Sequence, residues 1–214
     1  MDAEFWHQRW QNNQIGFHEK DVNPLLTEHL DSLGMQPGQR ILVPLCGKTR
    51  DIGWLLGCDL QVVGVELSDL AIQQLFADLD VMPEVSQTGP FRCYRTHHLT
   101  VFVGDFFYMD REQLGPVDAI YDRAALVALP QPMRVRYTRH LVDLTASAPQ
   151  LLITYEYDST LMQGPPFSVS STELTQHYGD VYQLSLLAND GMLGGLKRTL
   201  AQENVWLLQP HPTE

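Results

Sequence analysis

The sequence has few cysteines and few basic residues. Its three cysteines, Cys46, Cys58 and Cys93, are odd in number and show no CxxC spacing. A disulfide framework and a zinc site are therefore disfavoured, so we expect no metal and a reducing, cytoplasmic location. Lysine and arginine total 14 against 26 acidic residues, which gives a net charge of −12 at pH 7. Because such a surface repels phosphate backbones, we expect no nucleic-acid partner.

Long hydrophobic runs are also missing. No stretch approaches the ~18 apolar residues that a membrane span needs, and the amino terminus, MDAEFWHQRW, has no apolar core of a signal peptide. We expect no membrane partner. What remains is an ordinary globular composition, with 44% hydrophobic and 19% charged residues in a chain of 214. Without repeats or linkers, this predicts a single domain over residues 1–214, which we expect to act as a monomer.

Strands alternate with helices from residue 40 onward. Near-continuous apolar runs predict buried strands at 40–45, 60–66, 99–105, 117–122 and 150–157. Helices are expected at 5–11, from Pro24 to Gly34, up to Leu56, at 68–79 and at 131–145. The segments 181–188 and 204–209 predict a terminal antiparallel hairpin. The expected fold is α/β, with a mostly parallel, doubly wound, Rossmann-like sheet followed by that hairpin. Ligands bind such sheets at the carboxyl ends of the strands.

The turn after the first expected strand is one glycine short of a nucleotide-binding P-loop. This segment reads LVPLCGKT (42–49), with Leu42 where the pattern G-x-x-x-x-G-K-[ST] needs glycine. A P-loop holds phosphates with backbone N–H groups, and Pro44 has none. These features disfavour an ATP-hydrolysing enzyme.

A dinucleotide enzyme is the next alternative. It needs several glycines beside the pyrophosphate, and Gly47 stands alone in this turn. Glu66 nevertheless ends the second strand nineteen residues after Gly47, where an acid accepts from ribose hydroxyls. An adenosine ligand without pyrophosphate satisfies both observations, and S-adenosylmethionine is the commonest. We expect Glu66 to face an open cleft, where it would contribute little to stability without ligand. The alternative is a merely solvated carboxylate at the end of the strand.

Five segments that span most of the chain form a specific set: FWHQRWQNNQIGFH (5–18), LVPLCGKTRDIGWL (42–55), VVGVELSDLAI (62–72), YDRAALVALP (121–130) and GPPFSVS (164–170). In these segments the sequence closely resembles the thiopurine S-methyltransferase family, and specifically its bacterial members. The resemblance implies a class I methyltransferase fold, with an amino-terminal lid and helices in residues 1–34 and a Rossmann-like core in 40–214. It also implies S-adenosylmethionine as cofactor.

Particular site residues also follow from this resemblance. It implies that Trp10, with Trp6 nearby, belongs to a lid over the cofactor, that Leu45 contacts the cofactor and that Glu66 holds the ribose. Asp105 and Phe106 would border the adenine, Arg123 would lie between cofactor and acceptor, and Phe17 would line the acceptor pocket. The sequence has Ala124 where the family usually has glycine, which puts the space behind Arg123 in doubt.

The residues alone also allow plainer interpretations. Two tryptophans four positions apart are often simple packing. Arg123 could form an internal salt bridge with Asp122. On composition alone, Phe167 in GPPF would be only a packed residue of a turn. Cys46 invites comparison with a nucleophile, but no histidine is placed to activate it, so we expect a structural role.

The expected reaction is direct transfer of a methyl group from S-adenosylmethionine to a small aromatic or heterocyclic thiol, with selenium or tellurium species as further acceptors. An aromatic thiol ionises near neutral pH, so no general base is required, and catalysis would come from positioning and exclusion of water. Arg123 could favour the thiolate electrostatically. The alternatives are an ATP or NAD enzyme on a Rossmann-like fold and a non-catalytic cofactor-binding protein.

Overall fold

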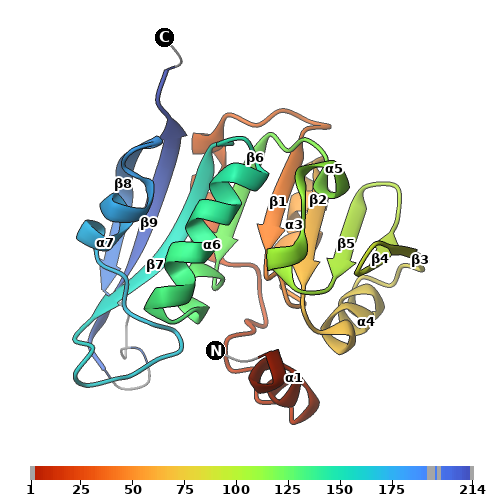
Figure 1. Ribbon diagram of the computed structural model, residues 1–214, viewed down its shortest axis with the longest axis horizontal. Coiled ribbons are helices and arrows are strands. Elements are labelled where there is room, and N and C mark those ends of the chain that lie inside the picture. Colours follow the sequence, from red (N-terminus) through yellow and green to blue (C-terminus); the bar gives the residue numbers. More distant parts are fainter. Residues whose placement is uncertain (1–2, 192–195, 197–198, 213–214) are drawn as a thin grey trace. The chain divides into compact units, whose positions relative to one another are not determined.

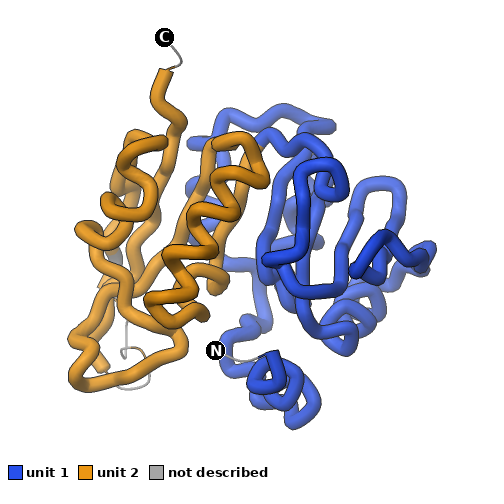
Figure 2. The backbone as a smooth tube through the Cα atoms, viewed as in Figure 1, with its two compact units in different colours: residues 1–118 blue, residues 119–214 orange. Residues whose placement is uncertain are grey.

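The computed structural model describes residues 3–191, 196 and 199–212, which divide into two compact units, 1–118 and 119–214 (Figure 2). Each unit contains strands of a β-sheet with helices beside them (Figure 1). The single domain expected over residues 1–214 stays a prediction beside this division. In the part of the chain that is described, no helix has the length and apolar character needed to cross a membrane.

The first unit contains a five-stranded sheet in the order β3-β4-β5-β2-β1. Its strands are β1 (Arg40–Pro44), β2 (Gln61–Glu66), β3 (Glu84–Thr88), β4 (Phe91–Arg95) and β5 (Leu99–Val103). Its helices are α1 (Ala3–Gln11), α2 (Pro24–His29), η1 (Leu30–Leu33), α3 (Asp51–Gly57), α4 (Asp69–Asp78), η2 (Phe106–Tyr108) and α5 (Arg111–Leu114). The pairs β1–β2 and β2–β5 are parallel, whereas β3–β4 and β4–β5 are antiparallel.

Local sequence signals set the helix ends of this unit. The side chain of Asn23 accepts from Leu25 N–H at 2.9 Å and Pro24 follows it, so α2 begins where the cap and the fixed φ of proline favour it. Ser68 caps α4 by accepting from Ala71 N–H. Helix α2 passes into η1, which ends at Gly34 with φ of 64°, a left-handed conformation that glycine adopts without strain.

The second unit contains four strands in the order β6-β7-β9-β8. They are β6 (Ala119–Arg123), β7 (Gln150–Tyr157), β8 (Tyr182–Gly191) and β9 (Ala201–Pro210); the helices are η3 (Leu126–Ala128), α6 (Gln131–Leu144) and α7 (Ser171–Tyr178). The β6–β7 pair is parallel, and β9 pairs antiparallel with both β7 and β8. Helix α7 begins with a capping bond, because Ser170 Oγ accepts from Glu173 N–H at 3.2 Å.

The structure confirms the α/β prediction, its buried strands and the terminal hairpin, and β7 has the predicted bounds. The sequence analysis missed β3, β4 and α7. Strand β3 reads EVSQT and is almost wholly exposed at a sheet edge, so it lacks a buried apolar face that a pattern could reveal. Helix α7 is short and polar, with only Leu174 and Tyr178 buried. The sequence has glycines between the last two strands, and those within 192–195 lie outside the described residues.

Candidate functional site

The predicted site residues fall in both units. Seven lie in the first unit: Trp6, Trp10, Phe17, Leu45, Glu66, Asp105 and Phe106. Arg123 lies in the second, as the last residue of β6. Within the first unit, hydrogen bonds and ring contacts connect Trp6, Trp10, Phe17 and Glu66 through the turn that follows β1, as described next.

Glu66 is a buried carboxylate that joins two turns. It ends β2 and is only 6% exposed. Its Oε2 accepts from Gly47 N–H at 2.8 Å, and its Oε1 accepts from Ser68 N–H at 2.9 Å. The alternative of a merely solvated carboxylate is therefore wrong, and so is the expectation that Glu66 supports little else in the ligand-free protein. A carboxylate has about four acceptor positions, so these backbone bonds still leave acceptor capacity for a further donor, such as a ribose hydroxyl.

Burial raises the pKa of Glu66 above its usual value because the charged form loses solvation. The N–H groups of Ser68, Gly47 and Leu67 oppose this rise by bonding the ionised form, and the charge of His7 in α1 acts in the same direction. These donors limit the rise in the pKa of Glu66 but do not cancel it. His7 also shows that α1 lies close to Glu66.

The turn after β1 is suited to close packing of other groups and not to phosphate binding. Its N–H groups are already used: Cys46 donates to Val65 O, Gly47 to Glu66 and Thr49 to Cys46 O. Lys48 lies 3.7 Å from Asp78. A phosphate-binding loop needs such N–H groups and its lysine turned to the ligand, so this geometry argues against an ATP enzyme.

Leu45 and Gly47 both have left-handed backbone in that turn. The φ of Leu45 is 47°, which costs a residue with a side chain of the order of 1 kcal/mol and is typical of functional sites. Strand β1 ends at Pro44, so Leu45 belongs to the turn and is half-buried. Gly47 has φ of 52°, and a Cβ there would lie 3.1 Å from Cζ2 of Trp10. Glycine therefore suits the left-handed conformation, and its lack of a side chain lets the Trp10 ring pack closely on this turn.

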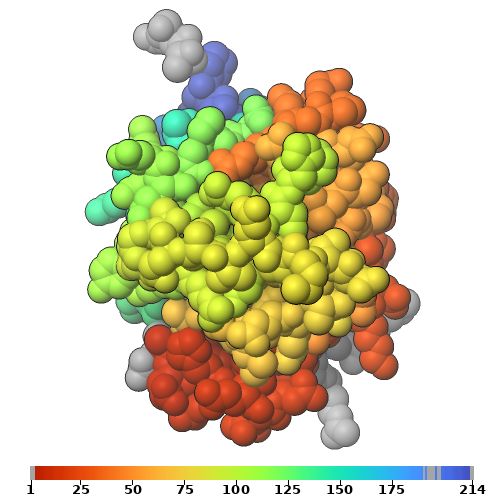
Figure 3. Space-filling view, turned by 90° about the vertical axis from the view of Figure 1, so that its right-hand side faces the viewer, coloured from red at the N-terminus to blue at the C-terminus, as the bar shows by residue number. Residues whose placement is uncertain are grey.

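Three aromatic side chains form a cluster around this seat. Phe17 packs edge-on against Trp6, with ring centroids 5.7 Å apart, and against Trp10 at 5.5 Å. Trp10 is 5% exposed, whereas Trp6 and Phe17 are half-buried. Helix α1 lies against α4 in the space-filling view, red beneath yellow-orange (Figure 3). The residues that the resemblance assigned to a lid and to an acceptor pocket therefore form one aromatic cap beside Gly47.

Asp105 and Phe106 follow β5 and take different roles. Asp105 is exposed, and its Oδ1 accepts from Phe107 N–H at 3.0 Å, which caps η2. Phe106 is buried at 3% exposure. Gly104 N–H donates to the backbone oxygen of Glu66 at 2.9 Å, so this segment begins beside the end of β2. The exposed carboxylate of Asp105 can accept from an amino group, whereas Phe106 offers chiefly packing.

Cys46 has the environment of a structural thiol. It is 6% exposed, and its Sγ would lie 2.8 Å from a Cβ placed on Gly64. Burial, and then the nearby charge of Glu66, raise its pKa well above the usual value, so the thiol stays protonated and unreactive. All three cysteines are free thiols. Over the described ranges, no group of three or more His, Cys, Asp or Glu is arranged to hold a metal.

In the second unit, Arg123 is half-buried at the end of β6 and precedes Ala124, whose φ is 62°. Its neighbour Asp122 is wholly buried. The Asp122 carboxylate accepts from Tyr137 O–H at 2.7 Å and from Leu126 N–H at 3.1 Å. The carboxylate that the sequence offered as a salt-bridge partner is thus engaged by a tyrosine and by the backbone of the next turn.

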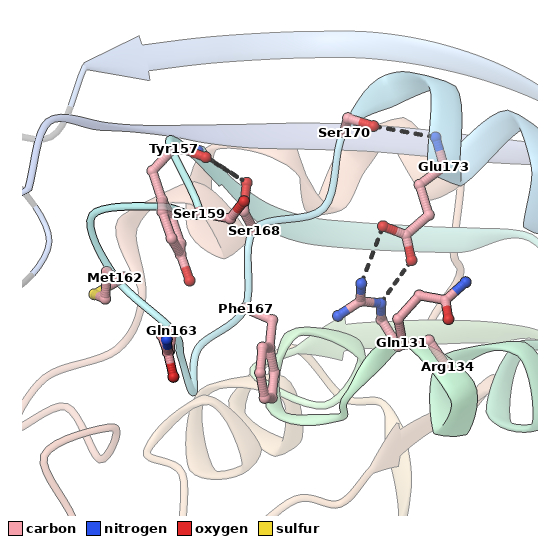
Figure 4. A pocket seen from close by; sticks show the side chains of 10 residues that line it. All are labelled: Gln131, Arg134, Tyr157, Ser159, Met162, Gln163, Phe167, Ser168, Ser170 and Glu173. Carbon is pink, nitrogen blue, oxygen red and sulfur yellow. Dashed lines mark hydrogen bonds and ion pairs between the residues drawn. The ribbon is translucent and has the colours of Figure 1, made fainter.

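A hollow of about 650 Å³ lies in the second unit, beside the loop from β7 to α7 (Figure 4). Its lining residues come from α6, the end of β7, that loop and the first turn of α7: Gln131, Arg134, Tyr157, Ser159, Met162, Gln163, Phe167, Ser168, Ser170 and Glu173. Arg134 binds both oxygens of Glu173, at 2.7 and 3.0 Å, and its guanidinium lies 5.8 Å from the Phe167 ring.

Phe167 is more than the packed turn residue that its composition suggested. Its N–H donates to Val127 O at 2.6 Å, which ties the loop to η3. Gly164 has φ of 73°, and a Cβ there would lie 2.6 Å from Cδ1 of Phe167, so glycine lets the ring turn toward the hollow. The peptide bonds on either side of Pro165 are cis. Sequence reasoning missed this hollow, although the GPPF motif was its signal.

Known proteins are similar to this chain in sequence. The sequence profile of the thiopurine S-methyltransferase (TPMT) family matches residues 1–209. A thiopurine S-methyltransferase of Xanthobacter autotrophicus is 51% identical over 211 residues, which cover 98% of this chain and 99% of that protein. Another, of Teredinibacter turnerae, is 49% identical over 209 residues and 97% of each chain.

Two solved structures are also similar. A Burkholderia thailandensis 1,6-didemethyltoxoflavin-N1-methyltransferase, with bound 1,6-didemethyltoxoflavin and S-adenosylhomocysteine, has a TM-score of 0.67 at 12% identity, covering 98% of this chain and 87% of that one. A SAM-dependent methyltransferase of Anabaena variabilis has a TM-score of 0.63 at 14% identity, covering 97% and 95%. At these identities the likeness confirms the Rossmann-like class I methyltransferase fold alone.

Proposed function

The chain belongs to the thiopurine S-methyltransferase family, and we propose that it transfers the methyl group of S-adenosylmethionine to the sulfur of a small aromatic or heterocyclic thiol. The observation that carries the proposal is the bonding of Glu66. Its carboxylate takes one backbone N–H on each oxygen and keeps capacity for a ribose hydroxyl. The same bond uses up the N–H of Gly47, which a nucleotide phosphate would need.

The residues of the first unit fit an adenosine ligand. Glu66 would accept from the ribose, Leu45 would contact the ligand from the turn, and Asp105 with Phe106 would border the adenine. Trp10 and Trp6 would cover it from α1. Support comes from the closeness of α1 to Glu66, the ring of Trp10 on Gly47 and the strained backbone of Leu45. The carboxylates of Glu66 and Asp105 favour a cationic ligand over a phosphorylated one.

The chemistry requires little from the protein beyond positioning. When bound, S-adenosylmethionine supplies a methyl group on a positively charged sulfur. Arg123 would stabilise the acceptor thiolate by its charge, and the cap of Trp6, Trp10 and Phe17 would exclude water. Asp122 is wholly buried and bonded, so it is not available to take the acceptor's proton. An aromatic thiol can enter the site already ionised.

We assign the acceptor ring to the hollow beside Phe167. A volume of about 650 Å³ lies within the usual range of small-ligand pockets. Phe167 offers an aromatic face, and Gln163 and Gln131 offer amides that can donate to and accept from ring nitrogens. Phe17, which the resemblance gave to the acceptor pocket, lies in the first unit, where it packs on Trp6 and Trp10.

We propose further that the enzyme acts as a monomer in the cytoplasm, without a nucleic-acid partner. Three free thiols suit a reducing compartment, and a net charge of −12 opposes phosphate backbones. Selenium and tellurium species would be acceptors because a polarisable nucleophile attacks the same methyl carbon.

The test is methyl transfer from labelled S-adenosylmethionine to a panel of thiopurines, other aromatic thiols, selenite-derived species and tellurite. We expect labelled product with the aromatic thiols. Phe167→Ala should raise the acceptor KM by about tenfold, from the lost ring contact, with the cofactor Kd unchanged. Leu161→Ala is the matched control, since Leu161 is 69% exposed on the same loop.

Melting temperatures separate the alternatives. S-adenosylhomocysteine at about a hundred times its Kd should stabilise the protein by about 2.7 kcal/mol, and ATP and NAD should not. Stabilisation by ATP or NAD alone would indicate a nucleotide enzyme. Stabilisation by S-adenosylhomocysteine without transfer to any acceptor would indicate a non-catalytic binding protein.

A further inference from the structure

The turn after β6 holds a residue in an unfavourable conformation directly beside Arg123. Ala124 has φ of 62°, and the chain then enters η3 at Leu126. A left-handed residue with a Cβ persists only where its surroundings fix it. Because Arg123 immediately precedes Ala124, whatever fixes this backbone also sets the direction in which the Arg123 side chain leaves the strand.

Asp122 supplies that fixing. Its Oδ1 accepts from Leu126 N–H at 3.1 Å, which closes the turn over Arg123 and Ala124. Its Oδ2 accepts from Tyr137 O–H at 2.7 Å, which joins the turn to the middle of α6. Asp122 and Tyr137 are both fully buried, so water does not compete for either bond. One carboxylate therefore ties together β6, the turn and α6.

We propose that Asp122 and Tyr137 are positioning residues for Arg123, and that they make the rate of methyl transfer depend on pH. This inference rests on the proposed function for its activity readout. Its structural part, the coupling of Arg123 to the buried pair, is independent of the reaction.

The buried pair titrates in the physiological range through Asp122 alone. Burial raises the pKa of Asp122 to about 6, against the bonds from Tyr137 O–H and from the N–H groups of Leu126 and Ala125, which lower it. The groups that face it are Tyr137 from α6 and, at longer range, Tyr178 from α7. Burial raises the pKa of both tyrosines well above the usual value, so both stay neutral.

Protonation of Asp122 weakens its hold on the turn. Above about pH 6 the carboxylate accepts two charge-assisted bonds, which are roughly twice as strong as neutral ones. Below that pH, one oxygen carries a proton and both bonds become neutral. The turn then loosens, and Arg123 spends less time in the direction that the strand end and the turn impose on it.

The activity test measures kcat and the acceptor KM against pH with 5-mercapto-2-nitrobenzoate, an electron-poor thiol that stays ionised over the range. The wild type should lose kcat as pH falls through about 6. Tyr137→Phe removes a bond that lowers the pKa of Asp122, so this acid limb should move upward by up to about one pH unit. Asp122→Asn keeps the shape but not the charge: its oxygen can still accept from Leu126 N–H, whereas its NH₂ can only donate to the Tyr137 oxygen. Its kcat should be about tenfold lower at high pH and should show no acid limb.

Tyr182→Phe is the matched control. Tyr182 is also a buried tyrosine of the second unit, but its hydroxyl donates to Ala148 O at 3.0 Å. Its loss should leave the pH profile in place. An acid limb that is the same in wild type, Tyr137→Phe and Asp122→Asn would overturn the proposal, because a merely structural role does not move with the charge of Asp122.

Isotope-edited NMR of the ligand-free protein provides the second readout. The Arg123 side-chain N–H and the Leu126 amide resonances should titrate together in the wild type, at a higher pH in Tyr137→Phe and not at all in Asp122→Asn. An Arg123 resonance that ignores these changes would refute the coupling even if the activity profile moved. Failure of the wild type to methylate any thiol would count against the proposed function, and the Arg123 resonance would then decide the coupling alone.

Discussion

Each unit has a buried carboxylate at the end of a parallel strand, and the two carboxylates differ in what surrounds them. Glu66 ends β2 in the first unit and accepts one backbone N–H on each oxygen. Asp122 stands one residue before the end of β6 in the second unit, with one backbone N–H and one tyrosine O–H. Burial raises the pKa of both acids. In both cases the carboxylate braces the turn that follows its strand.

The difference lies in the remaining acceptor capacity. Tyr137 covers one side of Asp122, which has no exposed surface, so this carboxylate serves the protein's own backbone. Glu66 is 6% exposed, and the histidine and aromatic residues of α1 lie near it. A strand-end acid after an apolar run therefore indicates a braced turn in either unit, and its neighbours decide whether it also meets a ligand.

The largest expected effect is a difference in stability between the alanine variants of two buried tryptophans, one from each unit. Trp206 in β9 is 8% exposed, and its indole N–H donates to Thr154 at 3.2 Å. Trp206→Ala should cost about 3–5 kcal/mol of unfolding free energy, as for other core aromatics. Trp10 is as deeply buried, but it is the only buried residue of the nine-residue α1. Trp10→Ala should weaken cofactor binding by about tenfold or more and leave global stability nearly unchanged, as expected of a lid.

Denaturant unfolding beside calorimetric titration with S-adenosylhomocysteine distinguishes the two variants. A loss of about 3–5 kcal/mol at unaltered affinity for Trp10→Ala would end the lid proposal. It would also show that the first unit uses its tryptophan as the second unit does.

The next effect concerns the dependence of stability on pH. The pKa of Asp122 is about 6 in the folded chain, against roughly 3.9 when unfolded. Between these values the folded state binds more protons, so Asp122 adds stability as pH falls from about 7 to about 4. The gain is on the order of 2–3 kcal/mol and is lost as pH rises through about 6.

Asp122→Asn should remove this slope, which denaturant unfolding at a series of pH values measures. The variant minus the wild type is the informative quantity, because acidification also relieves the repulsion of a chain with net charge −12. Equal slopes in the two proteins would contradict the burial of an ionised Asp122. The wild type with Asp122 protonated is then the more stable form, but its Arg123 is less well positioned.

The sequence predicted the architecture because buried strands and capped helices leave strong local signals. The helices predicted to begin at Pro24 and near Ser68 do so, with Asn23 and Ser68 as their caps, and Gly34 ends the first of these segments. Strand β3 and helix α7 escaped because exposed, polar segments carry no apolar period.

The sequence predicted which residues belong to the candidate site but not the contacts between them. The resemblance and the spacing from Gly47 singled out Glu66, yet its burial and its two backbone bonds depend on two turns folding back on it. The contact of Trp10 with Gly47 joins residues 37 positions apart, which no local pattern encodes. Tyr137 likewise reaches Asp122 from another helix.

The most direct test of the cofactor site is titration calorimetry of Glu66→Gln with S-adenosylhomocysteine. Glutamine keeps one acceptor oxygen but turns an NH₂ toward a backbone N–H, so stability should fall by about 1–3 kcal/mol, contrary to the expectation for an open carboxylate. Cofactor affinity should fall by roughly ten- to a hundredfold, while the acceptor KM at saturating cofactor stays nearly unchanged. Glu84→Gln, on exposed β3, is the matched control and should change neither quantity. Wild-type affinity in Glu66→Gln would contradict the placement of the cofactor at this carboxylate.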